Sequence, residues 1–161
     1  MSSRRGKSVP ETTVLFLHGL HSTPGGVKPT YLRECGFNVL NPHLPDEDFD
    51  ESVRIAQEIY DDYRPTTVIG SSRGGAVAVN LEADEAKLIL LCPAWKHYGD
   101  ATTVKPGTVI IHSRGDEVVP YSDSEELVRN SGLPGSTLLN IGADHRLAER
   151  EPLEAMAREV V

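Results

Sequence analysis

The chain has 161 residues, of which 39% are hydrophobic and 25% charged, a composition typical of a globular protein with one domain. Its formal net charge of −8 argues against nucleic acid or an anionic membrane as the main partner, because both require a positive surface. A small anionic substrate bound by a local arginine remains compatible with this charge. No apolar stretch reaches the roughly 20 residues that span a bilayer, so we expect no membrane partner.

The first segment, "MSSRRGKSVPE" (1–11), is polar and basic, and no apolar segment of signal type follows it. We expect a disordered tail over 1–11 and one domain over 12–161. The two cysteines, Cys35 and Cys92, lack any metal-ligand spacing, and we predict reduced thiols in a cytoplasmic protein, with Cys92 in the core.

Six short runs rich in leucine and β-branched residues predict strands. Several are apolar throughout, which is typical of strands buried on both faces of a parallel sheet. In chain order they are 13–17, 37–40, 66–71, 87–92, 108–113 and 136–141.

Helical patterns lie between these runs. We predict helices over 29–35, 48–63, 121–130 and 151–161: Pro29 and Gly36 bracket the first, and apolar residues at helical spacing mark the second and the fourth. Ser122 and Glu125 have the spacing of a capping box at the start of the third of these. The alternation of strand and helix predicts a three-layer α/β/α sandwich with a mainly parallel six-stranded sheet. In such sheets the chemistry lies beyond the carboxyl ends of the strands.

The loop after the third predicted strand contains a candidate nucleophile. The pentapeptide "GSSRG" (70–74) matches G-x-S-x-G, in which the serine stands on a strained turn between a strand and a helix. A glycine-rich turn or a phosphate cradle is the alternative, but a Walker-type loop needs a lysine and a longer glycine spacing. We therefore predict that Ser72 is the nucleophile.

A serine hydroxyl needs a base that accepts its proton, and six histidines are available. His145 follows the last predicted strand, on a loop that can carry an imidazole over the serine. His112 lies at a strand end and is expected to be packed or hydrogen-bonded there, and His97 is expected on the surface or in the pocket lining. We predict that His145 is the base.

The base in turn needs an acid to orient it. Asp116 directly follows the fifth predicted strand, whose loop neighbours that of His145 if the last two strands pair. Asp144 is adjacent to the histidine in sequence and is expected to be a turn residue, and Asp100 is the reserve candidate. We predict Asp116 as the acid.

Acyl transfer also requires donors for an oxyanion, commonly two backbone N–H groups. The amide of Arg73 follows the nucleophile at a predicted helix start. The second donor should come from the loop after the first strand, and we predict the amide of Leu20. Gly19 would let this loop pass close to the site.

With these residues in place, the chain resembles the α/β-hydrolase superfamily, and more narrowly the small lidless serine esterases of the YqiA and RBBP9-like kind. The residues that carry the resemblance are His18-Gly19, the elbow at 70–74, "GDEVVP" (115–120) and Asp144-His145. The resemblance implies a Ser72–Asp116–His145 triad and ester hydrolysis through an acyl-enzyme, with no metal and no cofactor. The loop after the first strand departs from the HGGG form that many relatives have.

The resemblance also bears on the substrate. Larger relatives carry a lid after the fourth strand, but here residues 93–106 are too few to build one. We therefore expect an open site for a small-molecule acyl ester or thioester, and we predict His18, Gly19, Trp95 and Tyr98 as substrate-binding residues. Trp95 and Tyr98 could equally be core cover. The Arg73 side chain is expected to point to solvent or to pair with an acid, and the alternative is that it holds a substrate carboxylate.

The sequence thus predicts a serine hydrolase that cleaves short-chain esters or thioesters. The alternatives are a hydrolase-fold protein-binding module with little activity, and an acyltransferase or lyase that uses the same elbow.

Overall fold

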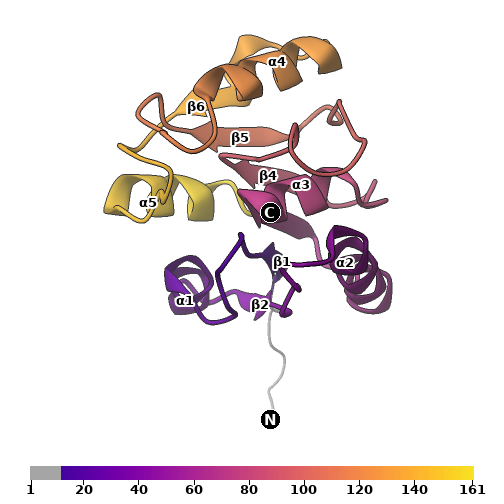
Figure 1. Ribbon diagram of the computed structural model, residues 1–161. Coiled ribbons are helices and arrows are strands. Elements are labelled where there is room, and N and C mark those ends of the chain that lie inside the picture. Colours follow the sequence, from indigo (N-terminus) through magenta and orange to yellow (C-terminus); the bar gives the residue numbers. More distant parts are fainter. Residues whose placement is uncertain (1–11) are drawn as a thin grey trace.

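The computed structural model describes residues 12–161, and the tail predicted over 1–11 lies outside them. The described residues form a six-stranded, all-parallel sheet with the order β2-β1-β3-β4-β5-β6 (Figure 1). All six predicted strands are observed: the first has the predicted bounds, and the other five are shorter by one or two residues at one or both ends. The strands are β1 (Thr13–Leu17), β2 (Asn38–Leu40), β3 (Thr67–Ser71), β4 (Lys87–Leu91), β5 (Val109–His112) and β6 (Leu138–Asn140).

Helices cover both faces of the sheet and complete the predicted three layers (Figure 1). Side chains of α1 and α5 share one buried cluster with the sheet, and those of α2, α3 and α4 share the other. A short 3₁₀ turn precedes β6. The helices are α1 (Val27–Glu34), α2 (Phe49–Tyr63), α3 (Arg73–Val79), α4 (Tyr121–Ser131) and α5 (Arg150–Arg158), and the 3₁₀ turn is Gly135–Thr137.

Strand β1 shows why the apolar runs form a sheet that is buried on both sides. Successive side chains of a strand point to opposite faces. Val14 and Phe16 therefore pack with α1 and α5, whereas Leu15 and Leu17 pack with α2, α3 and α4. Each such burial contributes about 1.5–3 kcal/mol, so an uninterrupted apolar strand is stable only between two helical layers.

The capping of α4 differs from the prediction, although the helix starts at residue 121 as predicted. The helix begins at Tyr121, with Pro120 at the N-cap and no side-chain cap, so Ser122 and Glu125 lie inside the helix and form no capping box. The fixed φ of proline, here −59°, sets the chain direction for a helix start, and the Pro120 carbonyl accepts the N–H of Asp123 at 2.9 Å. The backbone carbonyl of Pro120 therefore supplies an acceptor at the helix start, where the prediction expected the side chain of Ser122 to supply one.

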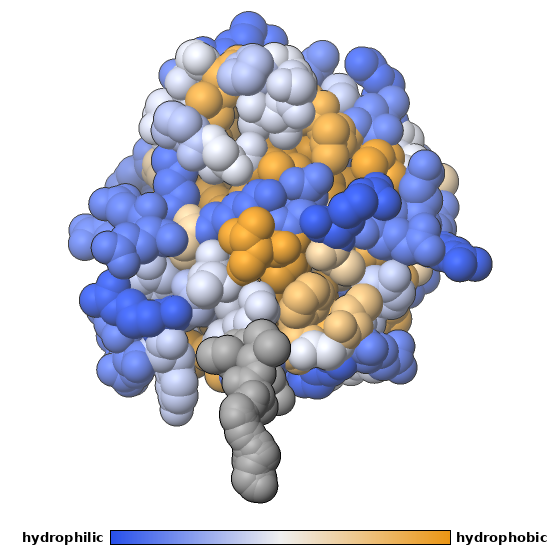
Figure 2. Space-filling view, turned by 180° about the vertical axis from the view of Figure 1, so that it is seen from behind, coloured by the Kyte–Doolittle hydropathy of each residue, from blue (hydrophilic) through white to orange (hydrophobic). Residues whose placement is uncertain are grey.

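The segment between β4 and β5, residues 92–108, contains no helix or strand. It returns from β4 to the neighbouring strand β5 as an irregular connection on the face that α2, α3 and α4 cover, in agreement with the expectation that no lid stands here. None of the helices within residues 12–161 combines the length and apolar character of a transmembrane segment. The face opposite to that of Figure 1 has hydrophilic side chains along its edges and apolar ones toward its middle (Figure 2).

Candidate active site

Ser72 stands on a sharp turn between β3 and α3. Its backbone has φ 55° and ψ −116°, a conformation that non-glycine residues rarely adopt and that costs about 1–3 kcal/mol. Its N–H donates to the carbonyl of Leu91 on the neighbouring strand β4 at 2.9 Å, which ties the turn to the sheet. The strained turn predicted from the G-x-S-x-G pattern is present.

The two outer glycines of the pattern are required by close approach. A methyl group at Gly70 would collide with the backbone of Gly74 and Gly75, and one at Gly74 would collide with the carbonyl oxygens of Leu17 and His18. Both clashes are with backbone atoms that cannot move aside cheaply. The glycines therefore allow α3 to start directly against β1 and β3.

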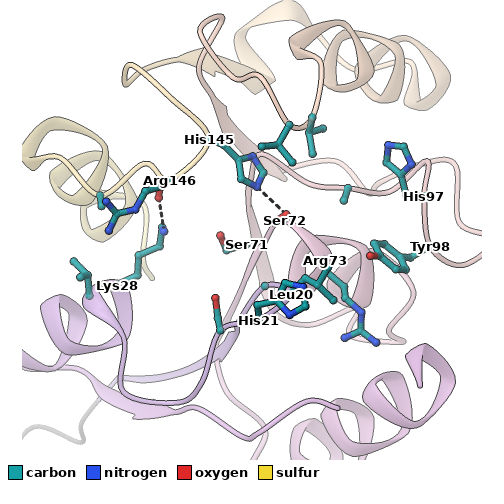
Figure 3. Close-up of a pocket in the computed structure, with 17 residues that line it drawn as sticks. Leu20, His21, Lys28, Ser71, Ser72, Arg73, His97, Tyr98, His145 and Arg146 are labelled. Carbon is teal, nitrogen blue, oxygen red and sulfur yellow. Dashed lines mark hydrogen bonds between the residues drawn. The ribbon is translucent and has the colours of Figure 1, made fainter. Parts of the chain in front are cut away.

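His145 reaches Ser72 from the loop after β6. Its Nε2 lies 3.0 Å from Ser72 Oγ, and its Nδ1 lies 2.7 Å from Asp116 Oδ2. Figure 3 shows the imidazole pointing at the serine. Because a carboxylate can only accept, Nδ1 carries the proton and Nε2 is free to accept the serine hydroxyl. The structure thus brings together the three residues predicted as nucleophile, base and acid.

Asp116 is fixed by its own loop. Its Oδ1 accepts the N–H groups of Val118 and Val119, each at 2.8 Å, and its side chain is buried. Burial alone would raise the pKa of this carboxyl, but the hydrogen bonds from His145, Val119 and Val118 outweigh burial and hold the pKa below its ordinary value. The acid is therefore an ionised, oriented acceptor for His145.

A second histidine supports Asp116 from β5. His112 Nε2 lies 3.0 Å from the Val119 carbonyl and 3.1 Å from Asp116 Oδ2, so this nitrogen carries the proton and donates to both. Its Nδ1 then accepts the Ser124 hydroxyl at 2.7 Å. Burial lowers the pKa of His112, so the imidazole is neutral. The expectation that His112 is packed and hydrogen-bonded at the strand end is confirmed.

The other candidate acid beside the base is occupied elsewhere. Asp144 Oδ1 accepts the backbone N–H groups of Arg146 at 3.1 Å and Leu147 at 3.4 Å, as the prediction of a turn residue required. His145 is bonded to Asp116 instead.

Two backbone donors next to Ser72 are available to an oxyanion. Within residues 12–161, neither the Leu20 N–H nor the Arg73 N–H has a hydrogen-bond partner. A Cβ at Gly19 would lie 3.3 Å from Ser72 Cβ, so the loop after β1 runs directly beside the nucleophile. Arg73 opens α3, where the helix dipole favours negative charge. Both amides keep their predicted roles as proposals.

A cleft of about 710 Å³ surrounds Ser72 and His145, and Gly19 and Tyr98 line it as predicted. His97, left open between the surface and the pocket, lines it too. Trp95 does not: it is buried in the core beside α4, where its Nε1 donates to the Asp123 carbonyl at 2.9 Å. The prediction of Trp95 as substrate-binding is therefore wrong. The alternative, that this side chain covers the core, is what the structure shows.

His18 is also not part of the cleft lining. It is buried, its Nε2 accepts the Leu44 N–H at 3.0 Å, and its Nδ1 accordingly donates to the Gly19 carbonyl at 2.9 Å. The prediction of His18 as substrate-binding is wrong: the ring positions the loop that carries Gly19 and Leu20.

The Arg73 side chain contradicts the expectation of a solvent-exposed or acid-paired arginine. It is 1% exposed, its guanidinium donates to Ser52 Oγ at 3.2 Å and to the Pro45 carbonyl at 2.9 Å, and it lies over the rings of Phe49 and Tyr98. Within the described chain it has no carboxylate partner, and its Nε has no hydrogen-bond partner. Neutral acceptors and aromatic faces thus hold a buried positive charge next to the nucleophile.

Cys92, Asp116 and His145 also place donor atoms within 4.8 Å of one another, a spacing that could hold a metal ion. Burial raises the pKa of the Cys92 thiol to about 12, and the thiol donates to the His145 carbonyl at 3.2 Å. A metal would have to ionise this thiol and break the bond between Asp116 and His145. The donor chemistry therefore fits the triad better than a metal centre.

Lys28 and Arg146 also line the cleft, and neither was predicted. They are 118 positions apart, and no local pattern marks either one. Lys28 meets the loop of His145 only because α1 and that loop lie side by side at the sheet edge (Figure 3).

No protein-family model and no curated protein sequence matches the chain, but solved structures do. Alpha/beta hydrolase domain-containing protein 10 from mouse is 14% identical, with 91% of this chain and 86% of that chain covered and a TM-score of 0.69. MGS-MChE2, an α/β-hydrolase enzyme from a lagoon-sediment metagenome, is 22% identical, with 91% and 87% covered and a TM-score of 0.66. A monoacylglycerol lipase from Paleococcus ferrophilus is 14% identical, with 91% of each chain covered and a TM-score of 0.69.

These likenesses define the class of structure: the chain has the α/β-hydrolase fold, in a small form without a lid between β4 and β5. The fold class predicted from the sequence is confirmed. The narrower resemblance to YqiA and RBBP9-like esterases stays a prediction.

Proposed function

We propose that this protein is a serine hydrolase that cleaves short-chain carboxylic esters or thioesters through an acyl-enzyme. The observation that carries the proposal is the pair of hydrogen bonds, 3.0 Å and 2.7 Å, that link Ser72 to His145 and His145 to Asp116 on a strained elbow. The fold is shared with a monoacylglycerol lipase, an enzyme of ester hydrolysis.

The geometry supports the following sequence of steps. His145 Nε2 takes the proton of Ser72 Oγ while that oxygen bonds to the acyl carbon, and the Asp116 carboxylate stabilises the imidazolium. The negative charge that forms on the acyl oxygen is held by the N–H groups of Leu20 and Arg73, each worth about 2.7–4 kcal/mol in comparable sites. The imidazolium then protonates the leaving alcohol or thiol, and water repeats the steps to release the acid.

The test is turnover of 4-nitrophenyl butyrate by the wild-type chain and by Ser72→Ala. We expect the variant to lose at least a thousandfold in kcat, because the attacking oxygen is gone. Ser71→Ala is the matched control, since it removes the neighbouring hydroxyl on the same turn. Equal turnover by Ser72→Ala and the wild type would refute the proposal.

The products separate hydrolysis from acyl transfer. A hydrolase releases butyrate whether or not an alcohol or amine acceptor is added, whereas an acyltransferase diverts the acyl group to the acceptor. A wild-type chain without turnover of any ester, thioester or peptide would favour a binding module.

A further inference from the structure

The charged side chains that line the cleft are all basic. Lys28, Arg73 and Arg146 line it together with three histidines, and within residues 12–161 no aspartate or glutamate does. The chain as a whole has a formal net charge of −8. A cleft whose charge is opposite to that of the protein concentrates anions and repels cations.

Lys28 is held in place with donors to spare. It is the second residue of α1, and its Nζ donates to the Arg146 carbonyl at 2.5 Å, beside the catalytic-site loop (Figure 3). An ammonium group has three N–H donors, and the described residues use one of them. Burial lowers the pKa of this amine because the charged form is poorly solvated there.

The charges that face Lys28 leave it without a counter-ion. Arg146 opposes its charge, and the Cys92 thiol beside it is neutral because burial raises the pKa of that thiol to about 12. Asp144 attracts Lys28 more weakly than Arg146 repels it, and no carboxylate of residues 12–161 lies within 4 Å of Lys28 or Arg146. Two residues of like charge thus line the same part of the cleft wall, and an anion bound beside them would relieve their repulsion.

Arg73 adds a third positive charge on the other side of Ser72 (Figure 3). It is buried without a carboxylate partner among the described residues, and its Nε has no hydrogen-bond partner there. Its Nη1 and Nη2 donate to Ser52 Oγ and the Pro45 carbonyl, which hold the guanidinium against the α2 side, so Arg73 contributes positive potential to the cleft rather than a direct contact with a ligand.

The rim of the cleft is apolar. Leu20, Val27 and Val118 line it and are 40%, 52% and 66% exposed. They are among the few large hydrophobic side chains of residues 12–161 that are exposed to solvent. A substrate that matches both features has a short apolar part and a negative charge.

We propose that the cleft selects acyl esters or thioesters that carry a negatively charged group, and that Lys28 and Arg146 hold this group. The inference rests on the proposed ester hydrolysis and names its substrate class. The charge can lie on the acyl chain or on the leaving alcohol, because both parts of an ester bound at Ser72 lie in the same cleft.

Two matched pairs of esters locate the charge. The acyl pair is the mono-4-nitrophenyl ester of adipic acid against 4-nitrophenyl hexanoate, and the alcohol pair is 4-acetoxybenzoate against its methyl ester. In at least one pair we expect kcat/KM to be about tenfold or more higher for the anion, the gain of a hydrogen bond to a charged group. We also expect inorganic phosphate to inhibit turnover of 4-nitrophenyl hexanoate competitively.

The variants assign the preference to residues. Lys28→Gln and Arg146→Gln should each lower the ratio of kcat/KM between anionic and neutral ester by about tenfold. Arg146 is exposed, so its replacement keeps the test valid if Lys28→Gln folds poorly. Lys87→Gln is the matched control, because it removes the same charge at the amino end of β4, the end away from the cleft, and should leave the ratio unchanged.

The outcomes separate the two proposals. Turnover that depends on Ser72, with equal kcat/KM within both pairs and no inhibition by phosphate, overturns the anion site alone. A preference for the anion that survives both Lys28→Gln and Arg146→Gln overturns the assignment to these residues. Absence of turnover that depends on Ser72 for all four esters overturns the proposed function, and this inference with it.

Discussion

Replacement of Asp116 by asparagine should disable the site while the fold persists. In the wild type, one carboxylate oxygen accepts the N–H groups of Val118 and Val119, and the other accepts Nδ1–H of His145 and Nε2–H of His112. Asparagine has one acceptor oxygen for these four donors. His112 Nε2–H keeps the Val119 carbonyl as an acceptor at 3.0 Å, whereas the two backbone N–H groups have no other acceptor among the described residues. We expect the oxygen to stay with the backbone and the NH₂ group to face His145.

The consequence for the base follows from its tautomer. An NH₂ group next to Nδ1 requires Nδ1 to accept, which moves the imidazole proton to Nε2. That nitrogen lies 3.0 Å from Ser72 Oγ and can then no longer take its proton. The same change in a well-characterised triad lowers kcat by roughly 10⁴, which corresponds to about 5.5 kcal/mol of transition-state stabilisation.

Steady-state kinetics with 4-nitrophenyl butyrate measure the effect, with thermal unfolding to show that Asp116→Asn is folded. Asp144→Asn and Asp100→Asn are matched controls, because they make the same chemical change at the two other acids considered for the role. We expect each control to stay within about threefold of the wild type. A folded Asp116→Asn that keeps more than a tenth of wild-type kcat would refute the reasoning.

Three further outcomes are expected. Gly74→Ala should lower the free energy of unfolding by more than about 2 kcal/mol, because the added methyl meets backbone carbonyls; a loss below 0.5 kcal/mol in urea unfolding, roughly the scale of a neutral surface change, would count against the close approach. In the native protein, iodoacetamide should alkylate exposed Cys35 and spare Cys92 until urea unfolds the chain, and mass spectrometry reports both sites. The folded pKa of His112 lies below 6.5, so its contribution to stability is present above that pH and is lost as the pH falls toward the folded pKa. Unfolding free energies at pH 5, 6 and 7 should therefore fall less steeply for His112→Gln than for the wild type, by up to about 1.4 kcal/mol per pH unit; equal slopes would contradict the buried neutral ring.

The fold was predictable because its signals are local. Each strand is a short apolar run. Strand β1, for example, distributes its side chains over both faces of the sheet. The positions of Ser72, Asp116 and His145 followed from the rule that parallel strands deliver their following loops to one edge, and the structure places these three side chains in contact. The start of α4 was predicted at residue 121, but its capping was not, because Pro120 rather than Ser122 takes the N-cap position.

The destinations of side chains were harder to predict. Arg73 looks exposed in sequence, but α2 supplies it with the Ser52 hydroxyl as a neutral acceptor and with the aromatic face of Phe49, which only the tertiary structure shows. Trp95 and His18 are buried by contacts with residues 28 and 26 positions away. The proximity of Lys28 to Arg146 depends on the packing of α1 against the last loop, and no periodicity encodes it.

The most direct test of the central claim is covalent labelling by a fluorophosphonate, read by mass spectrometry of the intact protein and its peptides. Such a probe reacts only with a hydroxyl whose proton a neighbouring base can take. We predict one adduct per chain, on Ser72, which Ser71→Ala retains and which both Ser72→Ala and His145→Ala lose. An unlabelled wild-type chain, or an adduct on any other residue, would contradict the account.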